Sequence, residues 1–215
     1  MTRINTIVFD LDGTLLDTLD DLCNSVNYAL ARHAMPQRSQ KEIRSFLGNG
    51  IASLMRHAVP EGTSEEKFNE AFQTFRQHYV EHCLDLTQPY EGIMPLLDQL
   101  RKRRIKMAIV SNKLHPAVQE LNQRFFKEYI DSAVGESATV RRKPNPDAVI
   151  AALNELGSTK EEALYVGDSE VDLATAQNAG MACVCVTWGF RDKEVLTALH
   201  PDFLIDRPEE LLQII

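Results

Sequence analysis

The sequence lacks any uninterrupted apolar run approaching the roughly 20 residues that a transmembrane helix needs. It also lacks a signal-peptide pattern, because its first residues lead directly into the short apolar segment Ile7-Val8-Phe9 and then into Asp10. These two absences predict a protein that is soluble, cytoplasmic and without a membrane partner.

Cysteine is scarce, and the chain contains only Cys23, Cys83, Cys183 and Cys185. Their spacing is not CxxC, and their density is far below that of a secreted disulfide scaffold, so we expect reduced and mostly buried thiols. His78 and His82 lie close together on one predicted helix face beside Cys83, a pattern that would suit a transition metal. Because no fourth ligand is evident, we interpret them as an ordinary helix surface.

Positive charge is in deficit, since 23 Lys and Arg face 31 Asp and Glu and the formal net charge is -8. Affinity for the phosphate backbone rests on clustered Lys and Arg, so this balance argues against a nucleic-acid partner. The basic run Arg101-Lys102-Arg103-Arg104 ends a predicted helix, where positive charge favours the carbonyl end. A site for a small anion is not excluded, because it needs only a few local positive groups.

The composition predicts a packed core with one modest insertion, since the 215 residues are 44% hydrophobic and 25% charged. Short apolar segments typical of buried strands recur along the chain at Ile4–Phe9, Ile105–Val110, Tyr129–Val134, Ala163–Val166, Ala182–Val186 and Phe203–Ile205. Helical patterns such as Pro95–Arg104 and Pro146–Leu156 lie between them. This alternation predicts an α/β fold, a Rossmann-like parallel sheet with helices on both faces that binds ligands at the carboxyl ends of its strands.

One stretch interrupts the alternation and has only helical patterns. Residues Ser39 to Glu42 and Thr63 to Glu66 resemble capping boxes, and apolar faces recur at Leu19, Leu22, Val26 and Leu30 and at Phe68, Phe72, Phe75 and Tyr79. We therefore predict a helical domain at residues 17–83, inserted into a core of residues 1–16 and 84–215. The chain returns to the core near the turn-rich segment Pro89-Tyr90-Glu91-Gly92.

Polar residues with the chemistry of phosphoryl transfer follow the predicted strands. Asp10 and Asp12 can face one pocket if the chain is extended there. One carboxylate can attack phosphorus while the other handles the proton of the leaving group. Gly13 and Thr14 form a tight turn whose backbone N–H groups we expect to be free for the same site.

Three later segments would complete the site. Ser111 and Asn112, followed by Lys113, end the next strand and could hold phosphate oxygens. Lys143 precedes the rigid turn Pro144-Asn145-Pro146, which would fix a positive charge against those oxygens. Asp168 and Asp172 bring two carboxylates to a strand end and a helix start, which suits a hard divalent cation.

In this order the motifs resemble those of the haloacid dehalogenase-like phosphatases, and most closely the branch with phosphoglycolate phosphatases and their relatives. The matching segments are Asp10-Leu11-Asp12-Gly13-Thr14, Ser111-Asn112-Lys113, Lys143 with Pro144, and Gly167-Asp168 with Asp172. The resemblance spans the whole predicted core, and the helical insert lies where that branch carries its cap domain. It implies a phosphatase of small phosphate monoesters.

The resemblance also implies a role for each residue. Asp10 would be the nucleophile that forms an aspartyl-phosphate, and Asp12 the acid and then the base. Mg²⁺ would bind Asp10, the backbone carbonyl of Asp12 and Asp168, with Asp172 supporting it. The phosphoryl group would be held by Lys143, Ser111, Asn112, Gly13 and Thr14.

Substrate selection should come from the insert, because a core that holds only metal and phosphoryl group cannot distinguish leaving groups. In related capped phosphatases the loop between the first cap helices faces the active site, and Gly48-Asn49-Gly50 matches it here, with Arg56 as a weaker candidate. Alternatively, Gly48 simply ends one helix and Gly50 begins the next. The sequence does not distinguish a monomer from a homodimer.

Three other functions stay open at this point. A phosphosugar mutase like β-phosphoglucomutase shares the motifs, and an inorganic pyrophosphatase is possible within the same branch. A catalytically silent phosphate-binding protein is the third, although the complete set Asp10, Asp12, Lys143 and Asp168 argues against it.

Overall fold

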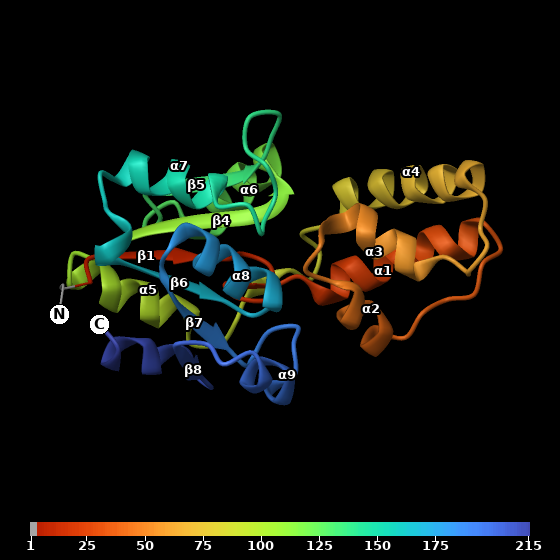
Figure 1. Ribbon diagram of the computed structural model, residues 1–215. Helices are drawn as coiled ribbons and strands as arrows, with labels where there is room; N and C mark the ends of the chain where they lie inside the picture. The colour runs from red at the N-terminus through yellow and green to blue at the C-terminus, as the bar shows by residue number, and fades with distance from the viewer. Residues whose placement is uncertain (1–3) are drawn as a thin grey trace. The chain divides into compact units, whose positions relative to one another are not determined.

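A computed structural model describes residues 4–215, which form two compact units (Figure 1). One unit contains the described residues up to Leu16 and those from Pro89 to the end, and the other contains Asp17–Gln88. Residues 1–3, which the predicted core range includes, lie outside the described residues. No helix within residues 4–215 is long and apolar enough to cross a membrane.

The first unit is built on a parallel sheet. Within residues 4–215 its strand order is β5-β4-β1-β6-β7-β8, and every neighbouring pair is parallel. The strands are β1 (Thr6–Phe9), β4 (Lys106–Leu114), β5 (Ser132–Glu136), β6 (Ala163–Gly167), β7 (Ala182–Val186) and β8 (Phe203–Ile205). β1 lies at the centre, so its carboxyl end is flanked by those of β4 and β6.

Helices cover both faces of this sheet (Figure 1). They are α5 (Ile93–Lys102), α6 (His115–Leu121), α7 (Asp147–Leu156), α8 (Glu170–Ala179) and α9 (Lys193–Ala198), with shorter turns at Asn122–Phe126, Lys160–Glu162 and Pro208–Gln213. On one face Val8 and Tyr165 pack in a buried cluster with Val149 of α7 and Leu173 of α8. The alternate strand residues, such as Ile7, point to the other face and are also buried. The predicted α/β class and parallel sheet are therefore confirmed.

Several element boundaries differ from the sequence prediction, and two of them have a clear local cause. The segment expected as a strand from Tyr129 is a turn until Ser132, because the carbonyl of Phe126 accepts the backbone N–H groups of Tyr129 and Ile130. The helix expected to begin at Pro95 begins at Ile93, directly after Gly92 with its φ of 84°. By contrast, the helix that ends at Leu156 is stopped by Gly157 in the left-handed conformation, as its sequence indicates.

The second unit contains four helices among residues 17–88: α1 (Leu19–Arg32), α2 (Gln40–Phe46), α3 (Gly50–Ala58) and α4 (Glu65–His82). Ser39 and Glu42 form the reciprocal capping box, while α4 is capped by Ser64, whose hydroxyl accepts the Lys67 N–H. The expected apolar faces are largely buried, including Val26 of α1 and Phe75 of α4. The two connections to the other unit, β2 (Leu16–Asp17) and β3 (Gln88–Pro89), pair with each other.

The helical unit extends further along the chain than the predicted end at Cys83. The carboxylate of Asp21 in α1 accepts the N–H of Leu86 at 3.0 Å, and the N–H and hydroxyl of Thr87 at 2.8 Å each. Asp21 is almost fully buried, so these bonds replace the water that its charge would otherwise hold. They fix the segment before β3 to the helices, and the boundary therefore falls at Pro89 and not at Leu84.

Candidate active site

The site lies at the carboxyl edge of the central strands. Phe9 is in register with Ile109 of β4 and with Val166 of β6, so the residues that follow these three positions meet at one edge. Asp10 extends the ladder, because its N–H donates to the carbonyl of Val166 at 2.8 Å. The ends of β1, β4 and β6 thus bring together residues that lie more than 150 positions apart in the sequence.

A buried ammonium joins two of the aspartates. Lys143 Nζ donates to Asp10 Oδ1 at 2.5 Å and to Asp172 Oδ1 at 2.7 Å, and these side chains are almost completely buried. Tyr165 completes the group, with its hydroxyl 3.2 Å from Lys143 Nζ and donating to Asp172 Oδ1 at 3.0 Å. The charge of Lys143 is therefore held against the end of β1.

Burial and neighbouring charge shift the pKa values of this group. Burial alone would lower the pKa of Lys143, but the negative charges of Asp10 and Asp172 outweigh it and hold that pKa well above its usual value. Burial raises the pKa of Tyr165, and the charge of Asp172 raises it further, so its hydroxyl keeps its proton and donates it. Burial, reinforced by the charge of Asp172, raises the pKa of Asp168 to about 7.

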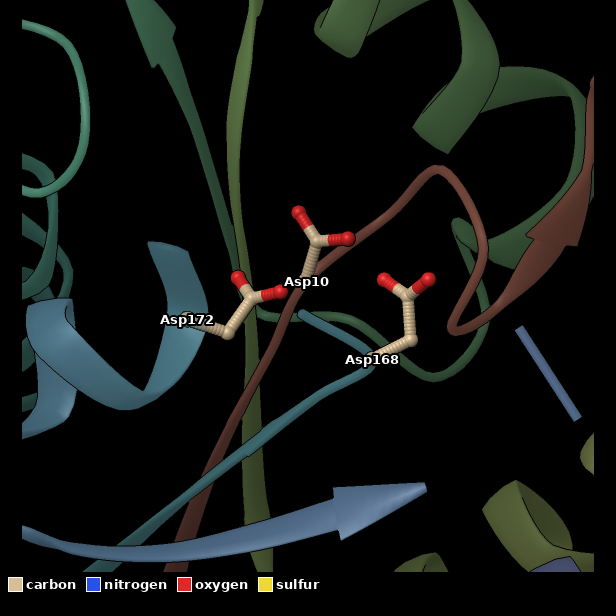
Figure 2. A group of neighbouring side chains, drawn as sticks. All are labelled: Asp10, Asp168 and Asp172. Carbon is tan, nitrogen blue, oxygen red and sulfur yellow. The ribbon is translucent and has the colours of Figure 1, made fainter. Parts of the chain in front are cut away.

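Three carboxyl groups converge in this site. Figure 2 shows the carboxyl groups of Asp10, after the end of β1, of Asp168, after the end of β6, and of Asp172 in α8 near one another, and each offers an oxygen within 4.8 Å of the others. Thr14 Oγ1 lies 3.5 Å from both Asp10 Oδ2 and Asp168 Oδ1. Oxygen donors of this kind suit a hard cation such as Mg²⁺, and three carboxyl groups beside one ammonium leave negative charge for such a cation to offset.

The three aspartates are not equally available to a metal. Both oxygens of Asp172 are engaged, Oδ1 by Lys143 and Tyr165 and Oδ2 by the N–H and hydroxyl of Ser169. Asp168 Oδ2 accepts the N–H of Phe190 at 2.6 Å, whereas its Oδ1 lies near the Thr14 hydroxyl that also contacts Asp10. The residues present fit a cation held mainly by Asp10 and Asp168, with Asp172 orienting Lys143.

Asp12 stands apart from this cluster. Its Oδ1 accepts a bond from Lys113 Nζ at 2.7 Å, and its Oδ2 lies 3.5 Å from the hydroxyl of Ser111. Its side chain is about 20% exposed, whereas that of Lys113 is 11% exposed. The side chain of Asp12 therefore pairs with a lysine and is not one of the three clustered carboxyl groups. The predicted metal contact of Asp12 is through its backbone carbonyl, and it stays a prediction.

The turn after Asp12 uses the backbone donors that the sequence analysis expected to be free. Gly13 N–H donates to the carbonyl of Leu16 at 2.9 Å, and Thr14 N–H donates to that of Leu11 at 3.4 Å. The expectation of free donors at Gly13 and Thr14 is therefore wrong, because the turn closes on its own carbonyls. Gly13 is required here for another reason: its φ is 93°, and a Cβ would lie 2.5 Å from Asp168 Oδ2.

Asn112 holds the loop that carries Lys143. Its Oδ1 accepts the Lys143 N–H at 2.7 Å, and its Nδ2 donates to the Lys143 carbonyl at 3.3 Å. Ser111 is buried next to it, and its hydroxyl accepts the N–H of Lys113 at 3.1 Å. The Lys143-Pro144 peptide bond is cis. The structure thus shows Asn112 bonded to the backbone of Lys143, while its role at the phosphoryl group stays a prediction.

Two residues of the site were not assigned from the sequence. Tyr165 could have been suspected, because a tyrosine inside an apolar strand must find a partner for its hydroxyl. Lys113 lies next to Ser111 and Asn112, but nothing in its local pattern indicates that it pairs with Asp12.

The candidate specificity residues all belong to the helical unit. Gly48 and Gly50 have φ values of 106° and 76°, and Asn49 precedes α3 without capping it through its side chain. The guanidinium of Arg56 is bound by Glu65 at 2.7 and 3.1 Å and lies 3.5 Å from the ring centre of Phe68. The guanidinium of Arg56 is therefore bound within the helical unit, which argues against Arg56 as a residue that contacts the substrate.

The alternative metal site on α4 has no support within residues 4–215. The rings of His78 and His82 stack with centroids 4.3 Å apart, and their Nδ1 atoms contact Ser25 and Asp85. In the described part of the chain, no third ligand lies close enough to these two histidines to complete a metal-binding group. All four cysteines lie within residues 4–215 and none is in a disulfide there, and Cys23, Cys183 and Cys185 are buried, as expected.

Known proteins resemble this chain over nearly its full length. A family model described as haloacid dehalogenase-like hydrolase matches residues 7–186. A phosphoglycolate phosphatase of Aquifex aeolicus is 31% identical, with 98% of this chain and 96% of that protein covered. The pyrophosphatase PpaX of Bacillus cereus strain AH820 is 32% identical, with 99% and 97% covered.

Solved structures show the same similarity. A proposed phosphoglycolate phosphatase from Lactobacillus delbrueckii subsp. bulgaricus superposes with a TM-score of 0.93 at 31% identity, covering 98% of this chain and 97% of that one. A haloacid dehalogenase-like family hydrolase from Streptococcus pneumoniae gives a TM-score of 0.89 at 27% identity, with 100% and 99% covered.

Proposed function

Because this chain belongs to the haloacid dehalogenase-like hydrolases and is one of their phosphatases, we propose that it hydrolyses a small phosphate monoester with Mg²⁺ through an aspartyl-phosphate on Asp10. The observation that carries this proposal is the buried contact between Asp10 and Lys143. A carboxylate fixed at a strand end beside an ammonium can meet an anionic phosphate, because the ammonium offsets the repulsion between them.

Two displacements at phosphorus make up the proposed reaction. A carboxylate oxygen of Asp10 attacks, the bond to the leaving oxygen breaks, and Asp12 gives that oxygen a proton. A water molecule then attacks the phosphorus of the aspartyl-phosphate, its proton passes to Asp12, and inorganic phosphate leaves Asp10 as a free carboxylate. Bound Mg²⁺, held by Asp10 and Asp168, would supply positive charge to the phosphoryl oxygens.

The other residues of the core orient these groups. Asn112 keeps Lys143 in place through its backbone, and Asp172 with Tyr165 fixes the direction of its ammonium. Ser111 lies beside Asp12, where its hydroxyl can donate to a phosphoryl oxygen. Within the helical unit, we propose that Asn49, which lies between Gly48 and Gly50, is the residue that contacts the leaving group.

Phosphoglycolate is the first candidate substrate, because relatives of similar length and 31% identity carry that name. Inorganic pyrophosphate is the second, favoured by the relatives named pyrophosphatase PpaX. In both compounds the group that leaves carries a negative charge of its own, a carboxylate in one and a phosphate in the other.

A panel of phosphate compounds tests the proposal. Purified protein with Mg²⁺ is incubated with phosphoglycolate, pyrophosphate, β-glucose 1-phosphate and p-nitrophenyl phosphate, and both phosphate release and isomer formation are followed. We expect release from phosphoglycolate or pyrophosphate with the highest kcat/KM. Isomer formation without release would identify a mutase, and binding without any turnover would identify a catalytically silent protein.

A further inference from the structure

The core of the site contains two lysines that serve different carboxylates. Lys143 Nζ contacts Asp10 and Asp172, on the side where the phosphoryl group would be accepted. Lys113 Nζ contacts Asp12 instead, at 2.7 Å. The two positive charges therefore pair with different carboxylates of the site.

We propose that Lys113 selects substrates whose leaving group is itself negatively charged, by binding that charge beside Asp12. This inference rests on the proposed function, in which Asp12 contacts the leaving oxygen. When both bonds meet at the same oxygen of Asp12, the Lys113 ammonium lies within about 6 Å of the leaving oxygen, the length of two hydrogen bonds in series.

The surroundings of Lys113 strengthen such an interaction. Its side chain is only 11% exposed, so water screens its charge much less than at the surface. An ammonium has three donors, so it can bond to Asp12 and to a second anion at the same time. A neutral leaving group offers this ammonium no opposite charge.

The position of Lys113 is fixed by the strand. β4 continues to Leu114, past the point where the pairing of Val110 with Val134 shifts register, so Lys113 lies on an extension of the central sheet. Its N–H donates to the hydroxyl of Ser111 at 3.1 Å, which ties its backbone to a neighbour of Asp12. The side chain is thus held beside Asp12 by the same segment that places Ser111 and Asn112.

The competing explanation is that Lys113 only neutralises Asp12. Under that explanation its loss affects every substrate alike, whatever the charge of the leaving group. Under our proposal its loss affects charged leaving groups more. The ratio of two specificity constants distinguishes these explanations, whereas the activity on one substrate does not.

The test compares phosphoglycolate with phosphoglycolamide, in which an amide of similar size replaces the carboxylate. For the parent protein with Mg²⁺ we expect kcat/KM to be higher for phosphoglycolate than for phosphoglycolamide. In Lys113→Met we expect the ratio of these two constants to fall by about 10-fold to 100-fold, which corresponds to the loss of one hydrogen bond to a charged group. Lys113→Arg should retain most of the preference. As a matched control, Lys106→Met removes a lysine from the other end of β4, where Nζ bonds to the carbonyl of Leu156, and should leave the ratio unchanged.

An unchanged ratio in folded Lys113→Met overturns the proposal. Equal kcat/KM for the two compounds in the parent also overturns it, and that measurement needs no variant to fold. Either result leaves the proposed function intact, provided that the parent protein hydrolyses p-nitrophenyl phosphate and that this activity is lost in Asp10→Asn. Loss of the proposed function has a different signature, since the parent would then hydrolyse none of the compounds.

Discussion

Asn112 and Lys143 are joined by two hydrogen bonds, one in each direction between the amide side chain and the backbone of the lysine, at 2.7 and 3.3 Å. They connect the end of β4 to the loop before α7, 31 positions further along the chain. The position of the buried ammonium therefore depends on a side chain from another element.

We expect Asn112→Ala to lower kcat/KM for p-nitrophenyl phosphate by about 10-fold to 100-fold in a protein that stays folded, because a small displacement of Lys143 spoils its contact with the reacting oxygens. Steady-state kinetics and circular dichroism check this. Asn145→Ala is the control, since Asn145 bonds to the carbonyl of Arg142 in the same loop. Parental kinetics in Asn112→Ala would show that Lys143 needs no such support.

Asp10→Asn should reduce turnover at least about 1000-fold while the fold persists, because the amide keeps the shape but removes the nucleophilic charge and a metal ligand. The measurement is phosphate release at saturating substrate, with mass spectrometry to exclude deamidation back to aspartate. Near-parental activity in an intact variant would refute covalent catalysis by Asp10.

Removing the metal should abolish activity. With excess EDTA we expect phosphate release at background level, full recovery on adding Mg²⁺, and poor recovery with Ca²⁺, whose larger ion accepts more ligands and disturbs the geometry of attack. Isothermal titration of Mg²⁺ into the parent and into Asp168→Asn gives an independent readout, with weaker binding expected in the variant. Hydrolysis that persists undiminished in EDTA contradicts the assignment.

Asn49→Ala should change the ranking of substrates more than it changes hydrolysis of p-nitrophenyl phosphate. We expect at least one pair of substrates to shift about 10-fold relative to each other, since one lost polar contact has this effect on discrimination. Arg56→Ala serves as the comparison, because its guanidinium is already bound by Glu65 and Phe68 and the ranking should not move. A ranking that is the same in Asn49→Ala and the parent would place specificity elsewhere.

Much of the fold could be predicted because it is encoded locally. Most strands of the sheet contain a short apolar run, and Gly157 ends its helix through its own backbone preference. The strand expected at Tyr129 was placed too early because its apolar composition does not reveal the turn bonds from Phe126. Similarly, the end of the helical unit depends on Asp21, which bonds to Leu86 from 65 positions away.

The site was predictable in its residues but not in their pairing. Asp10, Lys143, Asp168 and Asp172 could be named because each follows a strand, precedes a rigid turn or opens a helix in a known motif. Which carboxylate binds which lysine depends on distances between segments far apart in the chain. For this reason the pairing of the Asp12 side chain with Lys113 was not anticipated, and Tyr165 and Lys113 were left without a role.

The close approach of the backbone to the aspartates also limits how this chain can vary. A Cβ on Gly167 would overlap Asp172, and one on Gly189 would overlap Asp168 and the carbonyl of Gly13. Even alanine, the smallest change available to a glycine codon by volume, would displace a carboxylate of the site. In a mutational library selected for activity, these glycines should therefore be as depleted of substitutions as the aspartates themselves, although neither has a functional group to contribute.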